Sequence, residues 1–378
     1  MKRPLAVYVH LPWCVSKCPY CDFNSHAAPA DLPEDAYVAA LLDDLAGDLD
    51  LAAGRPVESV FFGGGTPSLF SASAIARILS GIGSALPLRP DAEVTLEANP
   101  GTVERGRFED YARAGVNRVS LGAQSFSAPR LRSLGRIHTP GDTEAAVREL
   151  ERAGIDNFNL DLMYALPGQD LDAALADLRT ALSLGPAHLS HYQLTLEPGT
   201  PFFHRPPPLP DDDLALEMQI ACQSRLDAAG FEQYEVSAYA RTGRRCHHNL
   251  AYWTFGDYLG LGAGAHGKLT TPEGVIFRTE KSRMPRDYMA KAAGGGAAMR
   301  RPVAGDELPF EWALNALRLT EGSTLAAFEE ATGLSAGVLE PVAESLRGRG
   351  LLDTANGRLR ATPLGLRFLN DVQAAFLR

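Results

Sequence analysis

Three cysteines lie close together near the start of the chain. Cys14, Cys18 and Cys21 have the spacing Cys-x3-Cys-x2-Cys, whereas Cys222 and Cys246 lie far along the sequence. Such clustering predicts a metal centre rather than a disulfide framework. Three thiolates on one short loop can bind three irons of a four-iron, four-sulfur cluster and leave the fourth iron with an exchangeable position.

The same loop leaves two other readings open. A structural zinc site needs four ligands, and Asp22 and His26 are the nearest candidates for the fourth. Three buried cysteines without a metal are the second alternative. We favour the cluster, because closed zinc sites usually use paired Cys-x2-Cys turns or added histidines.

Further polar residues follow a regular series of predicted strands. Short β-type segments alternate with helix-patterned segments, which predicts βαβ units around a parallel sheet. Cys14, Gly63–Thr66, Glu97, Gln124 and Asp161 lie at or just after the ends of successive strands. Barrels and open α/β sheets both place their sites at this edge, and the pattern alone leaves the closure of the sheet open. The predicted strands are 5–12, 59–64, 93–99, 118–124, 157–166 and 188–196, and the helices 35–49, 72–86, 105–114, 142–153, 171–184 and 213–229.

The rest of the chain is predicted to form an extension and a C-terminal domain. We expect a barrel core over 1–230, with a loop or rigid connector at Pro201–Pro210, then an extension over 231–300 with a linker at Gly294–Gly296. Gly260–Gly267 superficially suggests a dinucleotide loop, but we expect neither a strand before it nor a long helix after it, so we interpret it as close backbone packing. Helical segments and a hairpin over 301–378 predict a winged-helix-like domain.

The charge of the chain argues against a nucleic-acid partner. The 378 residues carry a net charge of −10, and residues 301–378 contain eight Arg, no Lys and ten Asp or Glu. Phosphate binding needs a basic face, so we predict no nucleic-acid binding.

The apolar run from Leu5 to Trp13 predicts a first strand rather than a signal peptide. No window approaches 18 apolar residues, and we expect a cytoplasmic protein.

Two motifs together carry a resemblance to a known family. The cysteine loop after the first strand and Gly63-Gly64-Gly65-Thr66-Pro67 after the second resemble the radical S-adenosylmethionine (SAM) superfamily. Over essentially the whole chain, the sequence resembles the oxygen-independent coproporphyrinogen III oxidase group and, within it, the HemW-type heme chaperones. The resemblance implies an α/β fold with a partial (β/α)6, TIM-like barrel and a C-terminal helical, winged-helix-like domain.

The resemblance also implies a [4Fe-4S] cluster on Cys14, Cys18 and Cys21, with SAM bound at its open iron. Each polar residue that matches a cofactor position could instead be a structural partner of a neighbouring group. By resemblance, the residues that contact the cofactor are Tyr8, Tyr20, Gly64, Gly65, Thr66, Glu97, Gln124, Arg136 and Asp161.

Two further positions separate the oxidases from the chaperones. The oxidases carry another cysteine two residues after the third, where this chain has Phe23. The stretch His248-Asn249-Leu250-Ala251-Tyr252-Trp253 matches the His-Asn-x-x-Tyr-Trp motif of the chaperone branch. A histidine can bind heme iron and aromatic rings can stack on the macrocycle, although His-aromatic clusters also occur as plain core.

The expected function is therefore a heme chaperone. Heme would be its cargo and heme-acceptor proteins its partners, and the resemblance allows a homodimer. Cys246 and His247 are rival ligands to His248. The main alternative is an oxygen-independent coproporphyrinogen III oxidase, so enzyme activity stays open. A nucleic-acid-modifying radical-SAM enzyme is a third class, suggested only by the C-terminal domain.

Overall fold

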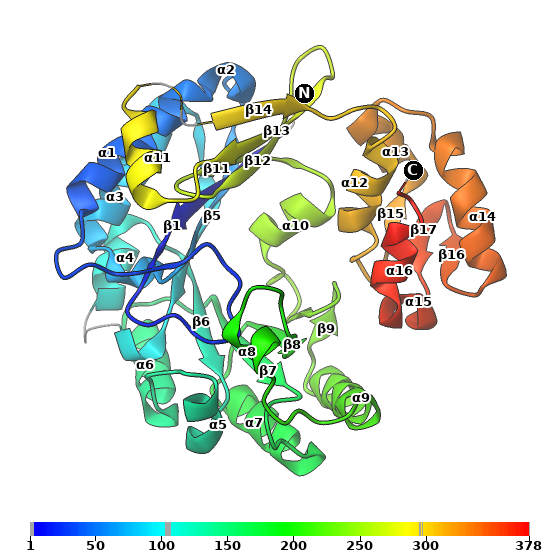
Figure 1. Cartoon of the computed structure of the whole chain (residues 1–378), viewed down its shortest axis with the longest axis horizontal. Coiled ribbons are helices and arrows are strands. Elements are labelled where there is room, and N and C mark those ends of the chain that lie inside the picture. Colours follow the sequence, from blue (N-terminus) through cyan, green and yellow to red (C-terminus); the bar gives the residue numbers. More distant parts are fainter. Residues whose placement is uncertain (1–3, 103–106, 295, 297, 378) are drawn as a thin grey trace.

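Strands and helices alternate through the first part of the chain as predicted. The computed structural model describes residues 4–102, 107–294, 296 and 298–377 (Figure 1). All six predicted strands are present, and the predicted helix at 105–114 begins at Arg107 in the described residues. The strands are β1 (Leu5–Leu11), β4 (Val57–Gly64), β5 (Leu88–Ala98), β6 (Arg118–Gln124), β7 (Phe158–Tyr164) and β8 (His188–Gln193). The helices that follow them are α1 (Glu34–Gly47), α3 (Ala72–Ala85), α4 (Arg107–Ala114), α6 (Pro140–Arg152), α7 (Leu171–Ser183) and α9 (Asp212–Ala228).

These strands form the parallel centre of one large sheet. Its order among the described residues is β14-β13-β12-β11-β1-β4-β5-β6-β7-β8-β10-β9. The two end strands do not pair with each other, so the strand pairing describes an open, partial barrel, and the predicted α/β fold is confirmed. β11 (Asp257–Leu261) pairs in parallel with β1 and was not predicted. Antiparallel strands complete the edges: β9 (Glu232–Gln233), β10 (Ala238–Ala240), β12 (His266–Thr270), β13 (Ile276–Lys281) and β14 (Ala298–Pro302).

The glycine-rich segment at Gly260–Gly267 runs from the end of β11 to the start of β12. The prediction that no strand precedes it was wrong, because β11 does, but β12 and not a helix follows. The predicted close packing is confirmed: a Cβ on Gly260 would lie 2.0 Å from the carbonyl oxygen of His266. The predicted linker at Gly294–Gly296 includes residue 295, which lies outside the described residues.

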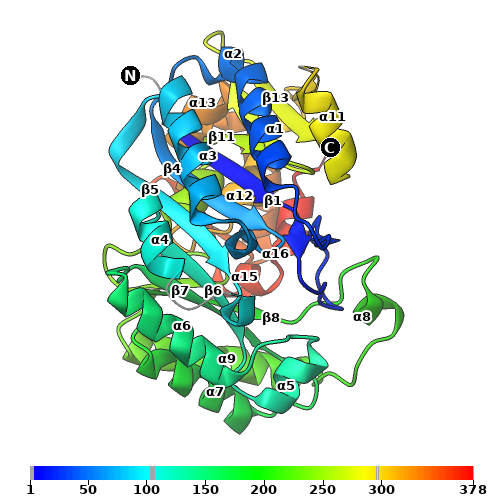
Figure 2. The ribbon, with the colours of Figure 1, turned by 90° about the vertical axis from the view of Figure 1, so that its left-hand side faces the viewer.

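The two faces of the sheet differ in chemistry. Outward side chains such as Val7, Phe62 and Leu121 are apolar and pack in the main core against the helices. Figure 2 shows α1, α3, α4 and α6 side by side across this outer face. The inner face carries polar side chains, including Glu97 and Asp161, because alternate strand residues point to opposite sides. The fold therefore gathers polar groups inside the partial barrel.

The C-terminal residues build a separate core beside the sheet (Figure 1). Three helices are followed by a hairpin whose strand β17 also pairs with β15, and two short helices end the chain. This order matches the winged-helix-like prediction. The elements are α12 (Leu308–Ala316), β15 (Ser323–Thr324), α13 (Leu325–Thr332), α14 (Glu340–Gly348), β16 (Leu352–Ala355), β17 (Arg358–Ala361), α15 (Pro363–Arg367) and α16 (Leu369–Ala374).

Two smaller findings concern segments outside the barrel strands. The proline-rich segment is not entirely loop, because Pro201–His204 forms the short helix α8, capped by the side chain of Thr200. Proline is well suited to the first turn of a helix, where its missing N–H has no partner to lose. Among the described residues, we find no helix long and apolar enough to span a membrane.

Candidate functional site

The cysteine loop is closed at its base by a short parallel ladder. β2 (Trp13–Cys14) pairs with β3 (His26–Ala27), and the N–H of Ala28 donates to the carbonyl oxygen of Cys14 at 2.9 Å. Inside the loop, the N–H of Cys21 donates to the carbonyl oxygen of Cys18 at 3.2 Å. These bonds hold three cysteines on one closed loop at the carboxyl end of β1.

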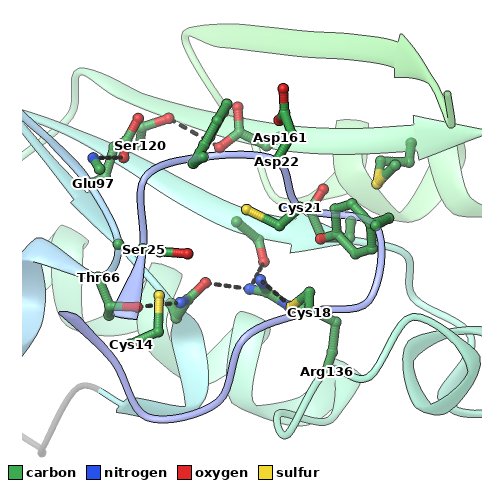
Figure 3. Close-up of a pocket in the computed structure, with 18 of the residues that line it drawn as sticks. Cys14, Cys18, Cys21, Asp22, Ser25, Thr66, Glu97, Ser120, Arg136 and Asp161 are labelled. Atoms are coloured by element: carbon green, nitrogen blue, oxygen red, sulfur yellow. Dashed lines mark hydrogen bonds between the residues drawn. The ribbon is translucent and has the colours of Figure 1, made fainter. Parts of the chain in front are cut away.

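The loop covers a cavity of about 430 Å³, the cysteine cavity. The three cysteines are half-buried and free of disulfides, and Figure 3 shows them around this cavity. The structure thus brings together most of the predicted cofactor residues. Of those predicted, Cys14, Cys18, Tyr20, Cys21, Gly64, Gly65, Thr66, Glu97, Gln124, Arg136 and Asp161 line it.

Close packing and backbone conformation require glycine at Gly64 and Gly65, which line the cavity. A Cβ on Gly65 would lie 2.6 Å from the carbonyl oxygen of Trp13, and Gly64 has a φ of +117°. The N–H groups of Gly65 and Thr66 donate to the carbonyl oxygens of Leu11 and Trp13, both at 2.8 Å. The glycines therefore let the end of β4 lie directly against the base of the cysteine loop.

A chain of hydrogen bonds connects the strand ends to Cys18 (Figure 3). The Asn99 amide donates to the Thr66 hydroxyl at 2.9 Å, and its oxygen accepts from Arg136. Arg136 also donates to the carbonyl oxygen of Gly122 at 2.8 Å, and its Nη1 lies 3.8 Å from Cys18 Sγ. The Arg136 guanidinium therefore places a positive charge beside the sulfur of Cys18, one of the three candidate metal ligands.

Two carboxyl groups lie on the opposite side of the cavity. Glu97 accepts a hydrogen bond from the N–H of Gly64 at 3.2 Å, and Asp161 accepts from Ser120 at 3.2 Å and from Asn159 at 2.8 Å. Burial, together with the nearby Asp161, raises the pKa of Glu97 to about 8. Burial also raises the pKa of Asp161. Buried carboxyls of this kind suit a ligand that brings positive charge and hydroxyl groups.

The remaining predicted residues, Gln124, Tyr20 and Tyr8, have different surroundings. Gln124 has a φ of +63° and accepts a hydrogen bond from the Tyr192 hydroxyl at 2.8 Å, so a strained residue faces the cavity. Tyr20 packs against Phe202 of α8, and the N–H of Phe202 donates to the carbonyl oxygen of Pro19 in the cysteine loop at 3.0 Å (Figure 2). Tyr8 is not among the residues that line the cysteine cavity; it stacks on Phe61 at 6.3 Å.

The donor set fits a four-iron cluster. Burial raises the pKa of the Cys14 and Cys21 thiols, so metal binding would have to displace protons from them. Each thiolate of such a cluster binds a different iron, so the ligands need not converge on one point. In the part of the chain that the structure describes, no three His, Cys, Asp or Glu side chains converge on a single ion.

The histidine of the aromatic motif is sealed inside the fold. α10 (His247–Trp253) crosses the inner side of the sheet, and Glu93 accepts hydrogen bonds from the N–H groups of His247 and His248, both at 3.1 Å. His248 is 1% exposed. Its ring nitrogens lie 3.0 Å from the Ser59 hydroxyl and 2.9 Å from the Tyr252 hydroxyl. Both nitrogens are therefore occupied in this structure.

The other motif residues face different surroundings. Trp253 lies under Arg318, whose guanidinium carbon is 4.4 Å from the ring centroid, so it contacts the C-terminal unit. Neither Trp253 nor Asn249 is among the residues that line the cysteine cavity. Cys246, a rival ligand, is fully buried and lies 3.4 Å from Glu93. The motif thus joins the barrel to the C-terminal unit.

Sequence reasoning missed several residues that shape this site. Asn99 joins Thr66 to Arg136, Ser120 supports Asp161, and Glu93 anchors α10. The signal for Asn99 was present, because it follows Glu97 in the predicted strand-end segment. Glu93 gives no such signal, because it lies in the middle of β5 and not at the carboxyl end of the strand.

Comparisons with known proteins agree with this arrangement. The model of the radical SAM superfamily matches residues 8–181, and the model of the HemN C-terminal domain matches residues 303–368. A solved structure described as coproporphyrinogen III oxidase (HemN) from Escherichia coli, a radical SAM enzyme, has a TM-score of 0.83. It covers 99% of this chain and 90% of that chain at 22% identity, which establishes the fold alone.

Curated relatives match over the full length. Heme chaperone HemW of Escherichia coli K12 is 50% identical, covering 99% of this chain and 98% of that protein. Heme chaperone HemW of Haemophilus influenzae is 46% identical, with the same coverage. A bovine mitochondrial protein, radical S-adenosyl methionine domain-containing protein 1, is 40% identical, covering 84% of this chain and 74% of that protein. Together with the cysteine loop and its cavity, these matches show that the chain belongs to the HemW family of the radical SAM superfamily.

Proposed function

We propose that this protein binds heme and transfers it to acceptor proteins. The full-length relationship to heme chaperones, at 50% identity over 98% of the Escherichia coli relative, carries the proposal. Phe23 supports it, because this side chain is 58% exposed and lines the cavity where a fourth loop thiol would stand in an oxidase. Transfer to acceptors, homodimer formation and residence in the cytoplasm stay predictions of the sequence.

The cysteine cavity would hold the resident cofactors. Cys14, Cys18 and Cys21 would bind a four-iron cluster, which supplies one-electron reduction and an open iron position. Arg136 would keep the negative cluster–thiolate unit close to a positive charge. Glu97, Asp161 and the backbone around Gly64 would bind and orient SAM on the opposite side, with Gln124 and Tyr192 beside it.

SAM binding should strengthen with rising pH through Glu97. A protonated Glu97 cannot pair with a cation, and this group loses its proton only around pH 8 in the free protein. The affinity of wild-type protein should therefore rise between pH 6.5 and 8, by at most about tenfold per pH unit, and level off above. Calorimetric titrations with SAM across this range measure the effect.

The Glu97→Gln variant is the matched control. It has no titrating group at this position, so its profile contains only the titration of the ligand and of other residues. The wild-type profile should be steeper than the variant profile below pH 8. Parallel profiles would exclude a contact between Glu97 and the cationic part of SAM.

The chaperone function is tested against the oxidase alternative. Anaerobically reconstituted protein is titrated with heme by absorbance, while a parallel sample with reductant and SAM is assayed for coproporphyrinogen III consumption. We expect stoichiometric heme binding and no consumption. Heme-loaded protein mixed with a smaller heme-free acceptor, such as apomyoglobin, should lose its Soret band from the 40.6 kDa fraction. Consumption that is lost in Cys18→Ala would identify an oxidase.

A further inference from the structure

A second cavity of about 510 Å³ opens beside the cysteine cavity. Gly64, Glu97 and Phe23 line both cavities, so a ligand in the second cavity would lie next to a ligand in the cysteine cavity. A volume of this size is typical of sites for cofactor-sized molecules. The second cavity is lined by Tyr8, His10, Phe23, Asn24, Gly64, Glu97, Tyr252, Tyr258, Gly264, Ala265, His266 and Arg283.

One histidine of this cavity is available to bind a metal. His266 begins β12 and is exposed, and neither of its ring nitrogens has a hydrogen bond among the residues that the structure describes. His10, by contrast, lies 3.0 Å from the Tyr8 hydroxyl through Nδ1 and 2.8 Å from the carbonyl oxygen of Asn24 through Nε2. His266 therefore offers a nitrogen without the loss of an existing bond.

The walls suit a flat, apolar ring. Tyr252 and Tyr258 meet edge to face, with ring centroids 4.5 Å apart and an interplanar angle of 89°. Phe23 adds an exposed aromatic ring from the cysteine loop. Aromatic walls of this kind stack on a macrocycle, and Tyr252 connects them to the buried His248.

A cationic side chain at the rim of the second cavity is available to bind carboxylate groups. Arg283 is exposed, and in the described part of the chain its guanidinium makes no hydrogen bond or ion pair. A guanidinium binds a carboxylate through two parallel hydrogen bonds. The cavity thus combines an iron ligand, aromatic walls and a site for the propionate groups of heme.

The side chain of Asn24 connects the same cavity to the cysteine loop. The Asn24 amide, three residues after Cys21, donates to the carbonyl oxygen of Ala263 at 2.8 Å and to that of Arg283 at 2.9 Å. These acceptors lie in the β11–β12 turn, which precedes His266, and beside the guanidinium at the rim. The geometry of the second cavity therefore depends on the ordered cysteine loop.

Taking the proposed heme function as its basis, we infer that heme binds in this second cavity with His266, and not His248, as an axial iron ligand. Arg283 binds a propionate, and Phe23, Tyr252 and Tyr258 contact the ring. Cargo must be released to an acceptor. An exposed ligand in an open cavity can be displaced by a competing ligand, whereas His248 is sealed between Ser59 and Tyr252.

Replacing His266 by alanine is the direct test. Wild-type protein and His266→Ala are loaded with ferric heme, passed through gel filtration, and compared by absorbance and electron paramagnetic resonance. We expect the variant to bind heme about tenfold more weakly or worse and to lose the histidine-ligated signature. Added imidazole should restore that signature in the protein-bound fraction of the variant.

Three further variants make the result decisive. His248→Gln should keep the wild-type heme spectrum, and so should His204→Ala, because His204 is exposed on α8 and outside this cavity. Arg283→Ala should weaken binding of heme but not of its dimethyl ester, which has no free propionates.

The outcomes separate the two proposals. Wild-type protein that binds no heme would overturn the chaperone function itself. Wild-type protein that binds heme, with an unchanged spectrum in His266→Ala, would overturn this site and leave the function standing. Loss of the histidine signature in folded His248→Gln alone would assign the ligand to the buried motif histidine.

Discussion

Cys18→Ala should yield a folded protein that holds almost no iron–sulfur cluster after anaerobic reconstitution. The variant keeps only two of the three loop thiols that line the cysteine cavity, and it also removes the sulfur beside Arg136. Two thiolates cannot anchor a cluster that needs a ligand on each of three irons. Iron and sulfide analysis, together with the absorbance of the cluster, measures the loss.

Cys222→Ala is the matched control for this result. Cys222 is a free, buried cysteine of α9 in the main core, and it does not line the cysteine cavity. Its replacement should leave iron and sulfide content at the wild-type level. If Cys18→Ala kept full cluster content, a neighbouring oxygen ligand such as Asp22, which also lines the cavity, would have to replace the thiolate.

Asp257→Ala should cause a large loss of stability. Asp257 accepts from Lys268 and from Arg55, both at 2.6 Å, and from the N–H of Thr270 at 2.7 Å. Lys268 and Arg55 are buried, so the variant would leave two cations in the core without their carboxylate. Removing one partner of a buried ion pair typically costs about 3–5 kcal/mol. Denaturant unfolding followed by circular dichroism measures the change.

An exposed ion pair provides the control for the stability loss expected of Asp257→Ala. Asp353 pairs with Arg360 at 2.9 Å on the hairpin of the C-terminal unit, and both side chains are more than 40% exposed. Asp353→Ala should therefore cost less than about 1 kcal/mol. Equal losses in the two variants would show that the buried pair is solvated or replaceable, and would contradict the assigned role of Asp257.

The parallel strands were predictable because their signals are local. β4 and β6, for example, are apolar segments bounded by helices with clear periodicity, and their ends matched the structure closely. β11 escaped prediction because it is short and contains glycine, and because its pairing partner β1 lies about 250 positions earlier. The hydrophobic pattern of a short segment does not indicate which distant segment it pairs with.

The candidate site was partly predictable for a geometric reason. Carboxyl ends of parallel strands meet at one edge of a sheet, so Glu97, Gln124 and Asp161 could be grouped from their positions alone. Tyr8 was placed with the cofactor, but the structure turns it toward Phe61 and the second cavity. Which motif side chains are exposed could not be predicted, because burial of His248 depends on Ser59, distant in sequence.

The position of β1 has a consequence for the order of events during protein synthesis. β1 lies between β4 and β11, so one of its edges stays unpaired until residues 257–261 have been made. The cysteine loop can reach its final structure only later, because the Asn24 side chain donates to the backbone oxygens of Ala263 and Arg283. Exposed strand edges of nascent chains invite aggregation. We therefore expect a cluster on this loop to be inserted late, after Arg283 has been made.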